Sequence, residues 1–412
     1  MKLKKLRTLI CLFLIITTLF FSLSGCYNSQ NIDRLAYVVA IGFDVGENNK
    51  LKLSFQVSVP SNSSDGGSSS QSDSSIVTSI ECSSFDSGVN ILNSYLSKES
   101  NLAHCKIIVF SEDFANRGIS ETLFTLMNTI DVRPDCNVLV SRCSAEYFLN
   151  NSKPMLEKLS ARYYEIAPTT SQYTGLTENV TLSQFFSDYT DTFRSSFAIL
   201  GGINSNNTHS ANVGESPTEI DASNKANETL IHGKPNIENI GLAVFYKDKL
   251  VGELTGLETI CHQIICNSLD TCVINIPSPF EEGQTISLKL RLVNNTKNKV
   301  ELVNGTPYIT SDVTLDARIL SMDENSKYLT MENVSLLEKS ANFYLTTKLH
   351  DYLYKVSKDL KSDIDGFGKY IVKDFLTMEE WENFDWLENF KNSFFDVKVE
   401  TKVKSGYIFM ES

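Results

Sequence analysis

Residues 35–59 read LAYVVAIGFDVGENNKLKLSFQVSV, and this stretch predicts a β-hairpin. The run from Ala36 to Asp44 is apolar and contains several β-branched residues, as expected for a buried strand. Residues 46–49 provide a turn, and apolar and polar residues then alternate from Leu51 to Val59, which is typical of a half-buried strand. The chain therefore begins its folded part with a sheet.

Helices and strands alternate after this hairpin. Apolar stripes at helical spacing predict helices over residues 85–96, 119–130 and 182–193, and a further helix is expected from Ser144. Short apolar runs predict strands over residues 106–110 and 137–140. Because strands separated by helices favour a layered sheet, the N-terminal half is expected to have an α/β layer structure.

The composition changes between Asn204 and Asn239, where apolar residues are few and scattered. Burial of so few apolar side chains cannot offset the entropy lost when the segment is ordered, which predicts a linker or long loop. We therefore expect a signal peptide over 1–25, an N-terminal domain over 26–203, a polar linker over 204–239 and a C-terminal domain over 240–412. A further split of the C-terminal domain near residue 280 is left open.

The C-terminal half also mixes strands and helices. The pattern predicts a hairpin over 240–246 and 249–253, a helix over 258–267, strands over 272–276, 286–293, 299–303, 308–320 and 395–403, and a long helix ending at Gly366-Phe367-Gly368. The fold class is thus expected to be α+β and multi-domain, with two to three α/β-type layers and mixed sheets.

The first 25 residues have the three parts of a secretory signal peptide. Four basic residues precede an apolar segment from Leu9 to Phe21, which is short for a helix that must span a bilayer with about 20 apolar residues. The following Leu23-Ser24-Gly25-Cys26 is similar to a bacterial lipobox. We expect cleavage before Cys26 and acyl chains (palmitate among them) on the mature protein, which two or more chains would anchor stably. An uncleaved signal anchor is the alternative.

The charge balance argues against nucleic-acid binding. The 412 residues include 37 Lys and Arg against 50 Asp and Glu, a formal net charge of −13. Removal of the signal peptide leaves 33 basic residues against the same 50 acidic ones. A surface of this sign repels phosphate backbones.

The sequence offers no catalytic constellation and predicts no cofactor. Zinc is the one metal to consider, because Cys261, His262, Cys266 and Cys272 lie close in sequence, but their spacing lacks a tight Cys-x-x-Cys pair. Gly368-Lys369 lacks the Ser or Thr of a phosphate loop and is interpreted as a helix stop. Trp381, Trp386, Phe384 and Phe390 form an aromatic cluster, interpreted as packing against the last strand rather than as a ligand platform. The predicted site residues are therefore none for catalysis, cofactor or metal, and Cys26 for lipidation.

Several segments in order resemble the C subunit of bacterial spore germination receptors, the Ger(x)C (GerAC-like) lipoprotein family. They are residues 31–36 running into 40–44, residues 103–119, residues 240–252 with Glu258-Thr259, and residues 363–368, Trp386 and 397–406. The resemblance covers nearly the full chain. One departure is Tyr27-Asn28, where family members commonly have Trp-Asp.

The resemblance implies a non-enzymatic subunit on the outer face of the spore inner membrane. Such a subunit would be held by acyl chains on Cys26 and would assemble with membrane A and B subunits to trigger germination by small nutrients. A competing hypothesis is a solute-binding lipoprotein that captures a small nutrient between its domains, since clefts between domains are common ligand sites. An exported hydrolase is the third class considered.

Overall fold

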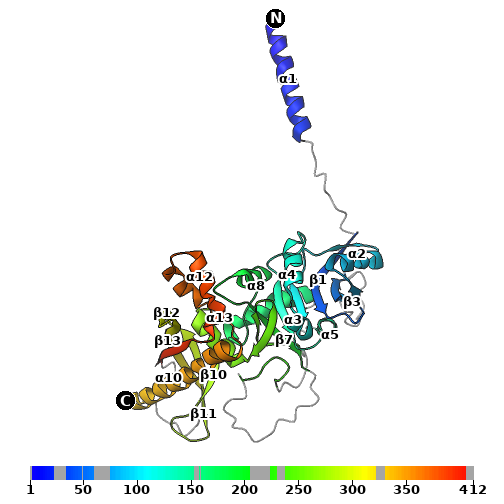
Figure 1. Cartoon of the computed structure of the whole chain (residues 1–412). Coiled ribbons are helices and arrows are strands. Elements are labelled where there is room, and N and C mark those ends of the chain that lie inside the picture. Colours follow the sequence, from blue (N-terminus) through cyan, green and yellow to red (C-terminus); the bar gives the residue numbers. More distant parts are fainter. Residues whose placement is uncertain are drawn as a thin grey trace.

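The computed structural model describes residues 2–22, 34–48, 50–59, 75–152, 157, 159–204, 223–229, 237–321 and 330–404. Helix α1 (Lys2–Ser22) stands apart from the other elements (Figure 1). Within these ranges, no helix combines the length and the apolar character needed to cross a membrane. Cys26 lies outside the described residues.

The first sheet has nine strands in the order β3-β2-β1-β5-β6-β7-β8-β9, and β4 pairs with β1. The strands are β1 (Leu35–Asp44), β2 (Leu51–Ser58), β3 (Ser75–Cys82), β4 (Glu99–Asn101), β5 (Ile107–Ser111), β6 (Asn137–Ser141), β7 (Phe197–Ile203), β8 (Ile237–Tyr246) and β9 (Lys249–Leu254). Its centre, β1-β5-β6-β7, is parallel, and an antiparallel pair extends each side. The predicted hairpin of β1 and β2 is confirmed.

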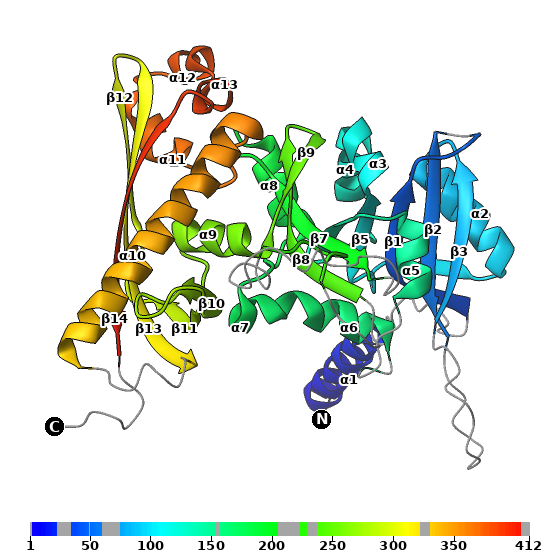
Figure 2. The ribbon, with the colours of Figure 1, turned by 90° about the horizontal axis from the view of Figure 1, so that it is seen from below.

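Helices flank this sheet (Figure 2). They are α2 (Phe85–Leu96), α3 (Glu112–Arg117), α4 (Ser120–Asn128), α5 (Ala145–Asn151), α6 (Ser160–Ile166), α7 (Ser171–Thr174) and α8 (Leu182–Thr190), with a 3₁₀ turn at Ala167–Thr170. Every residue of β5, β6 and β7 is buried, as expected for parallel strands covered on both faces. The predicted α/β layer structure of the N-terminal half is therefore confirmed.

The second sheet is built around the 16-residue strand β13 (Thr306–Ser321). One edge of β13 pairs with β12 (Lys297–Val303) and then with β11 (Thr285–Leu292), and the other edge pairs in parallel with β14 (Phe394–Val403). Strand β10 (Cys272–Pro277) completes the sheet beside β11. Both sheets contain parallel and antiparallel pairs, so the fold is α+β with mixed sheets.

Two helices occupy the space beside and between the sheets (Figure 2). Helix α10 (Met331–Tyr354) packs along β14, and its buried residues recur every three or four positions. Helix α9 (Gly256–Cys266) is buried along nine of its residues because it contacts the first sheet, β13 and α10. Helix α9 thus joins the two sheets.

The prediction that the long helix continues to Gly366 is wrong. Helix α10 ends at Tyr354, a π-helical turn follows at Lys355–Asp359, and Lys361 has a positive φ of 52°. The next residues bond to the first sheet instead of continuing the helix, since the Ser362 hydroxyl donates to the Phe245 carbonyl at 2.6 Å. The backbone N–H of Ser195 donates to the Asp363 carbonyl at 2.8 Å.

Gly368 begins a helix rather than stopping one. Four short segments carry the chain from there to β14: α11 (Gly368–Ile371), a 3₁₀ turn (Val372–Asp374), α12 (Met378–Phe384) and α13 (Trp386–Phe390). A Cβ on Gly368 would lie 2.6 Å from the Phe193 Cβ, so the close approach of these two segments requires glycine there.

The first sheet crosses the position predicted as a domain boundary. Strands β8 and β9 follow the polar segment in sequence, yet β8 pairs with β7, which precedes it. Glu238 at the start of β8 accepts a hydrogen bond from the Asn227 backbone, which ties part of the polar segment to the sheet. The division into domains stays a prediction.

Candidate functional site

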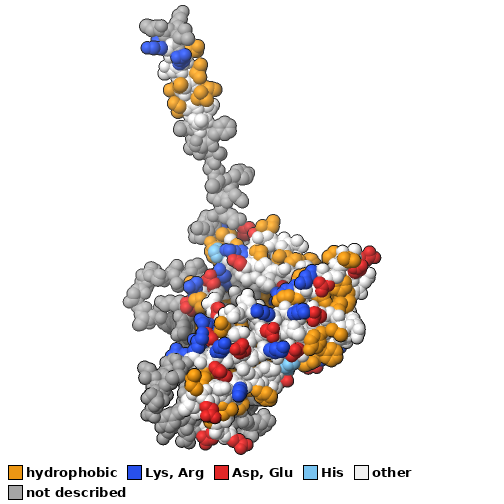
Figure 3. Space-filling model, turned by 90° about the vertical axis from the view of Figure 1, so that its left-hand side faces the viewer, with side chains coloured by type: hydrophobic (Ala, Val, Ile, Leu, Met, Phe, Trp, Pro, Cys, Tyr) orange, Lys and Arg blue, Asp and Glu red, His pale blue; other side chains and the backbone are white. Residues whose placement is uncertain are grey.

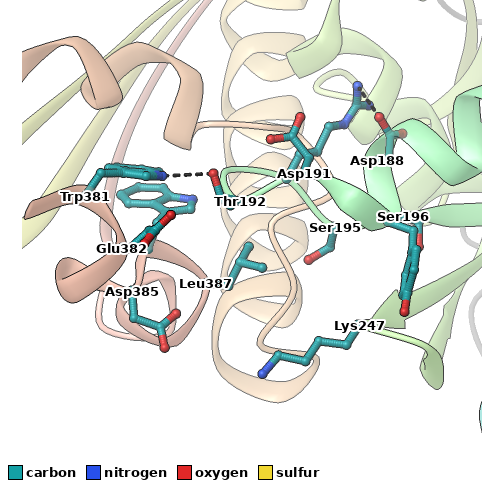
Figure 4. A pocket seen from close by; sticks show the side chains of 13 residues that line it. Asp188, Asp191, Thr192, Ser195, Ser196, Lys247, Trp381, Glu382, Asp385 and Leu387 are labelled. Atoms are coloured by element: carbon teal, nitrogen blue, oxygen red, sulfur yellow. Dashed lines mark hydrogen bonds and ion pairs between the residues drawn. The ribbon is translucent and has the colours of Figure 1, made fainter. Parts of the chain in front are cut away.

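A pocket of about 350 Å³ lies between the two halves of the fold (Figure 4). One wall is the connection from α8 to β7, residues 188–196, together with Lys247 in the β8–β9 turn. The other wall comes from α12 and α13 and includes Trp381 and Trp386. The pocket therefore exists only because residues far apart in sequence are brought together by the fold.

The two tryptophans form a rigid apolar wall. Both are 1% exposed, and their rings stack at a centroid distance of 6.3 Å. The Trp381 indole N–H donates to the Thr192 hydroxyl at 2.9 Å (Figure 4), and that of Trp386 donates to Asp363 Oδ2 at 2.7 Å. Thr192 thus orients Trp381 from the opposite wall, and Asp363 orients Trp386 from the segment that follows the π-helical turn.

The same aromatic cluster packs against the last strand. Phe390 of α13 meets Phe395 of β14 edge to face at 6.2 Å, and Trp386 lies 5.9 Å from Phe390. The packing interpretation holds for Phe390, which contacts the last strand directly, whereas Trp381 and Trp386 also line the pocket.

An ion pair forms part of the wall made by residues 188–196. Arg194 Nη1 lies 3.6 Å from Asp188 Oδ1, while Arg194 Nε donates to the Ile364 carbonyl at 3.0 Å. Burial raises the pKa of Asp188 above its ordinary value, although the Arg194 charge opposes this shift. Since Arg194 and Asp188 offset each other, the charge presented to a bound molecule comes from the other lining residues.

Acidic side chains outnumber basic ones in the rest of the lining. Asp191, Glu382 and Asp385 line the pocket against a single further cation, Lys247. Asp191 and Asp385 each accept a hydrogen bond from a nearby backbone N–H through one carboxylate oxygen. The second oxygen of each carboxylate does not take part in that bond. This excess of carboxylates favours a ligand that carries an amino group.

Two buried hydroxyls add hydrogen-bonding capacity. Ser195 and Ser196 line the pocket with exposed fractions of 3% and 1%, and neither hydroxyl has a hydrogen-bond partner among the described residues. Buried polar groups usually have a partner, so these hydroxyls are candidates for contacts with a bound molecule. Apolar rings, free hydroxyls and carboxylates together suit recognition of a small polar molecule.

Sequence reasoning missed the wall formed by residues 188–196. The available signal was a polar run, Asp191 to Ser196, placed directly between an amphipathic helix and the apolar stretch that begins at Phe197. Loops between rigid elements often hold binding residues. Nothing in the local sequence pointed to its partner, α12 and α13.

The four residues considered for zinc are not assembled as a set. His262 and Cys266 share one face of α9, with Cys266 Sγ 3.8 Å from His262 Nδ1. Cys261 points to a different side of α9 because adjacent helical residues diverge by about 100°. Cys272 is buried on β10 in the second sheet. The partner that joins His262 and Cys266 is Asp365.

Two further groups of charged residues, Glu379-Glu380 and Arg133-Asp135, lie at the surface. Glu379 and Glu380 lie in the exposed first turn of α12, and Arg133 pairs with Asp135 at 2.8 Å on an exposed turn. On the face in Figure 3, basic and acidic side chains are interspersed rather than gathered by sign. The lipidation prediction for Cys26 falls outside the described residues and stays a prediction.

Two family models match the chain in succession. The model described as the spore germination protein N-terminal domain matches residues 28–200, and the spore germination B3/GerAC-like C-terminal model matches residues 240–406. YfkR of Bacillus subtilis (strain 168) is 22% identical over 376 residues, covering 90% of each chain. The spore germination protein GerQC of Bacillus cereus is 22% identical over 401 residues, covering 95% of this chain and 97% of GerQC.

A solved structure is also similar. The crystal structure of the GerBC protein matches with a TM-score of 0.49 and 15% identity, covering 88% of this chain and 96% of GerBC. Together the two family matches leave out little more than the first 27 residues and the polar segment. The chain belongs to the family of GerAC-like spore germination proteins.

Proposed function

We propose that this protein is a lipid-anchored, non-enzymatic C subunit of a nutrient germinant receptor. It would be held by acyl chains on Cys26 at the outer face of the spore inner membrane and would assemble there with membrane A and B subunits. The observation that carries the proposal is the pair of family matches, which begins two residues after Cys26 and extends to residue 406.

The arrangement of the two sheets supports a coupling role. Helix α9 is buried against both halves, and residues 360–368 bond to the first sheet through Ser362 and Asp363. A body tied together in this way would transmit a displacement from one end to the other rather than absorb it. A receptor subunit that relays a signal between membrane partners needs this property.

The first experiment tests assembly. The chain with a C-terminal tag is recovered from detergent-solubilised spore inner membrane, and the proteins retained with it are identified by mass spectrometry. We expect multi-spanning A-type and B-type subunits to be retained. Recovery of the tagged chain alone would contradict the assembly.

The second experiment tests the anchor. Cys26→Ala should release the chain from the membrane fraction and impair nutrient germination, because the acyl acceptor is lost. Cys11→Ala is the matched control, since Cys11 lies in the apolar segment upstream of the proposed cleavage position. Normal germination by a released Cys26→Ala chain would contradict the proposal.

The pocket favours a second candidate function, the capture of a small amino-bearing nutrient. Its volume of about 350 Å³ falls within the range of small-molecule sites, roughly 300–1,000 Å³. The lining combines the buried indoles with the free hydroxyls of Ser195 and Ser196 and an excess of carboxylates.

Calorimetric titration of the purified chain with amino acids and nucleosides tests this candidate. Ser196→Ala should weaken any saturable binding because it removes an unpartnered hydroxyl from the pocket. Ser393→Ala is the matched control, since the Ser393 hydroxyl is also buried and unpartnered among the described residues but lies outside the pocket. Absence of saturable binding across both ligand classes would remove the candidate.

A further inference from the structure

His262, Cys266 and Asp365 converge in the buried region between the two sheets. His262 and Cys266 stand one turn apart on α9, and Asp365 comes from the segment that follows the π-helical turn. His262 Nδ1 lies 2.8 Å from Asp365 Oδ1, and Cys266 Sγ lies 3.8 Å from His262 Nδ1 and 3.5 Å from Asp365 Oδ1. Three different donor atoms therefore face one point.

These separations suit a bound metal ion. A point equidistant from the three donor atoms lies about 2.0 Å from each, whereas zinc binds His nitrogen and carboxylate oxygen at about 2.0–2.2 Å and Cys sulfur at about 2.3 Å. The triangle is acute, so this point lies inside it. An ion would need only a few tenths of an ångström of movement by the side chains.

Hydrogen bonding alone leaves part of the cluster unexplained. The Tyr352 hydroxyl donates to Asp365 Oδ1 at 2.8 Å, so this oxygen already has a partner. The Asp365 side chain is fully buried. Its second oxygen, Oδ2, has no hydrogen-bond partner among the described residues. The hydrogen bonds within the cluster thus leave one oxygen of this carboxylate without a donor, whereas most buried polar groups have one.

The outer contacts also match those of a metal site. Metal-binding histidines commonly direct their second ring nitrogen at a carboxylate, which fixes the ring orientation. His262 Nε2 lies 3.5 Å from Glu178 Oε2, and neither atom has a hydrogen-bond partner among the described residues. The Tyr352 hydroxyl fulfils the corresponding role for Asp365.

We propose that His262, Cys266 and Asp365 bind a divalent transition metal ion of the zinc class, with Glu178 and Tyr352 orienting the ligands. The mixed nitrogen, sulfur and oxygen donors favour zinc, cobalt or iron over calcium and magnesium, which prefer oxygen ligands alone. Because the ligands come from α9 and from residues 360–368, the ion would fasten these two segments to each other. This site shares no residue with the pocket or with the proposed anchor.

Cobalt(II) titration of the purified full-length chain tests the site. The chain is first reduced and freed of metal with a chelator, and Co²⁺ is then added while the near-ultraviolet absorption of a thiolate–cobalt bond is followed. We expect the band to saturate at one Co²⁺ per chain and to disappear when Zn²⁺ displaces cobalt. Absence of the band in the wild-type chain would overturn the proposal.

Matched cysteine variants assign the band. Cys266→Ser should abolish it, whereas Cys261→Ala should retain it, because Cys261 precedes His262 on α9 but contributes no donor. Tyr352→Phe should weaken Co²⁺ binding roughly tenfold through loss of its hydrogen bond to Asp365. A band of equal strength in Cys266→Ser would overturn the assignment.

Thermal unfolding provides a second measurement that does not depend on the cobalt spectrum. Zn²⁺ should raise the thermal unfolding midpoint of the wild-type chain and of Cys261→Ala, because an ion bound only by the folded state stabilises it. Cys266→Ser should show no such rise. An equal rise in Cys266→Ser would contradict the proposal even if its cobalt spectrum could not be recorded.

Discussion

Asp44 ends β1 and accepts two backbone hydrogen bonds from the first turn of α5. Its Oδ1 accepts from the N–H of Ala145 at 2.8 Å, and its Oδ2 accepts from that of Glu146 at 2.9 Å. The side chain thus binds the N-terminal end of a helix that follows about 100 residues later in the sequence. Replacing Asp44 by Ala removes both bonds at once.

The structure gives the size of the effect. A hydrogen bond to a charged acceptor contributes about 1.5–3 kcal/mol, and a carboxylate at a helix N-terminus gains further from the helix dipole. Ala145 is fully buried, so water cannot reach its N–H without local rearrangement. We therefore expect Asp44→Ala to cost about 3 kcal/mol, and Asp44→Asn about half as much because the amide oxygen can still accept one bond.

Hydrogen exchange of residues 144–152 measures this cost directly. A loss of about 3 kcal/mol corresponds to roughly 100-fold faster exchange in Asp44→Ala when α5 opens locally. Asp131→Ala, at an exposed turn, is the control and should change stability by less than about 0.5 kcal/mol. Exchange in Asp44→Ala within threefold of wild type would refute the reasoning.

Three shorter predictions concern the same packing and charge effects. Gly42→Ala should cost about 1–3 kcal/mol in urea unfolding, since its Cβ would meet α5 at 2.9 Å. Lys52 lowers the pKa of Glu146 by a hydrogen bond, so the wild type should be more stable than Lys52→Met by under about 1 kcal/mol at pH 6. The ordinary pKa of a glutamate carboxyl is 4.5, and the stability difference between wild type and Lys52→Met should vanish as the pH falls well below this value. Urea unfolding of both chains at a series of pH values measures this difference. Trp386→Phe should cost about 2 kcal/mol by the same assay because Asp363 loses a buried donor.

The sequence predicted most elements whose pattern is local. Strands β1, β2, β5, β6 and β8–β14 and helices α2, α4, α5, α8 and α9 follow from apolar periodicity and turn residues. Strands β3, β4 and β7 were not predicted. Strand β3 is only half-buried along most of its length, and β7 contains Gly201 and Gly202, which weaken a strand pattern.

The sites depended on contacts that no local pattern contains. Helical spacing places His262 and Cys266 on one face of α9, but Asp365 lies about 100 residues later, in a segment wrongly predicted as helix. The apolar residues up to Ile364 keep a helical spacing, yet bonds from Ser362 and Arg194 hold that backbone in another conformation. Tertiary hydrogen bonds therefore overrode the periodicity.

The pairing of β7 with β8 decides where this protein can be divided for biochemical work. A fragment ending near residue 200, or one beginning near residue 240, would separate two strands that form adjacent parts of one sheet. The first fragment would leave the buried strand β7 as a bare edge, which invites aggregation. A fragment that extends to Leu254 retains every strand of the first sheet, so soluble expression of the N-terminal half is expected only when β8 and β9 are included.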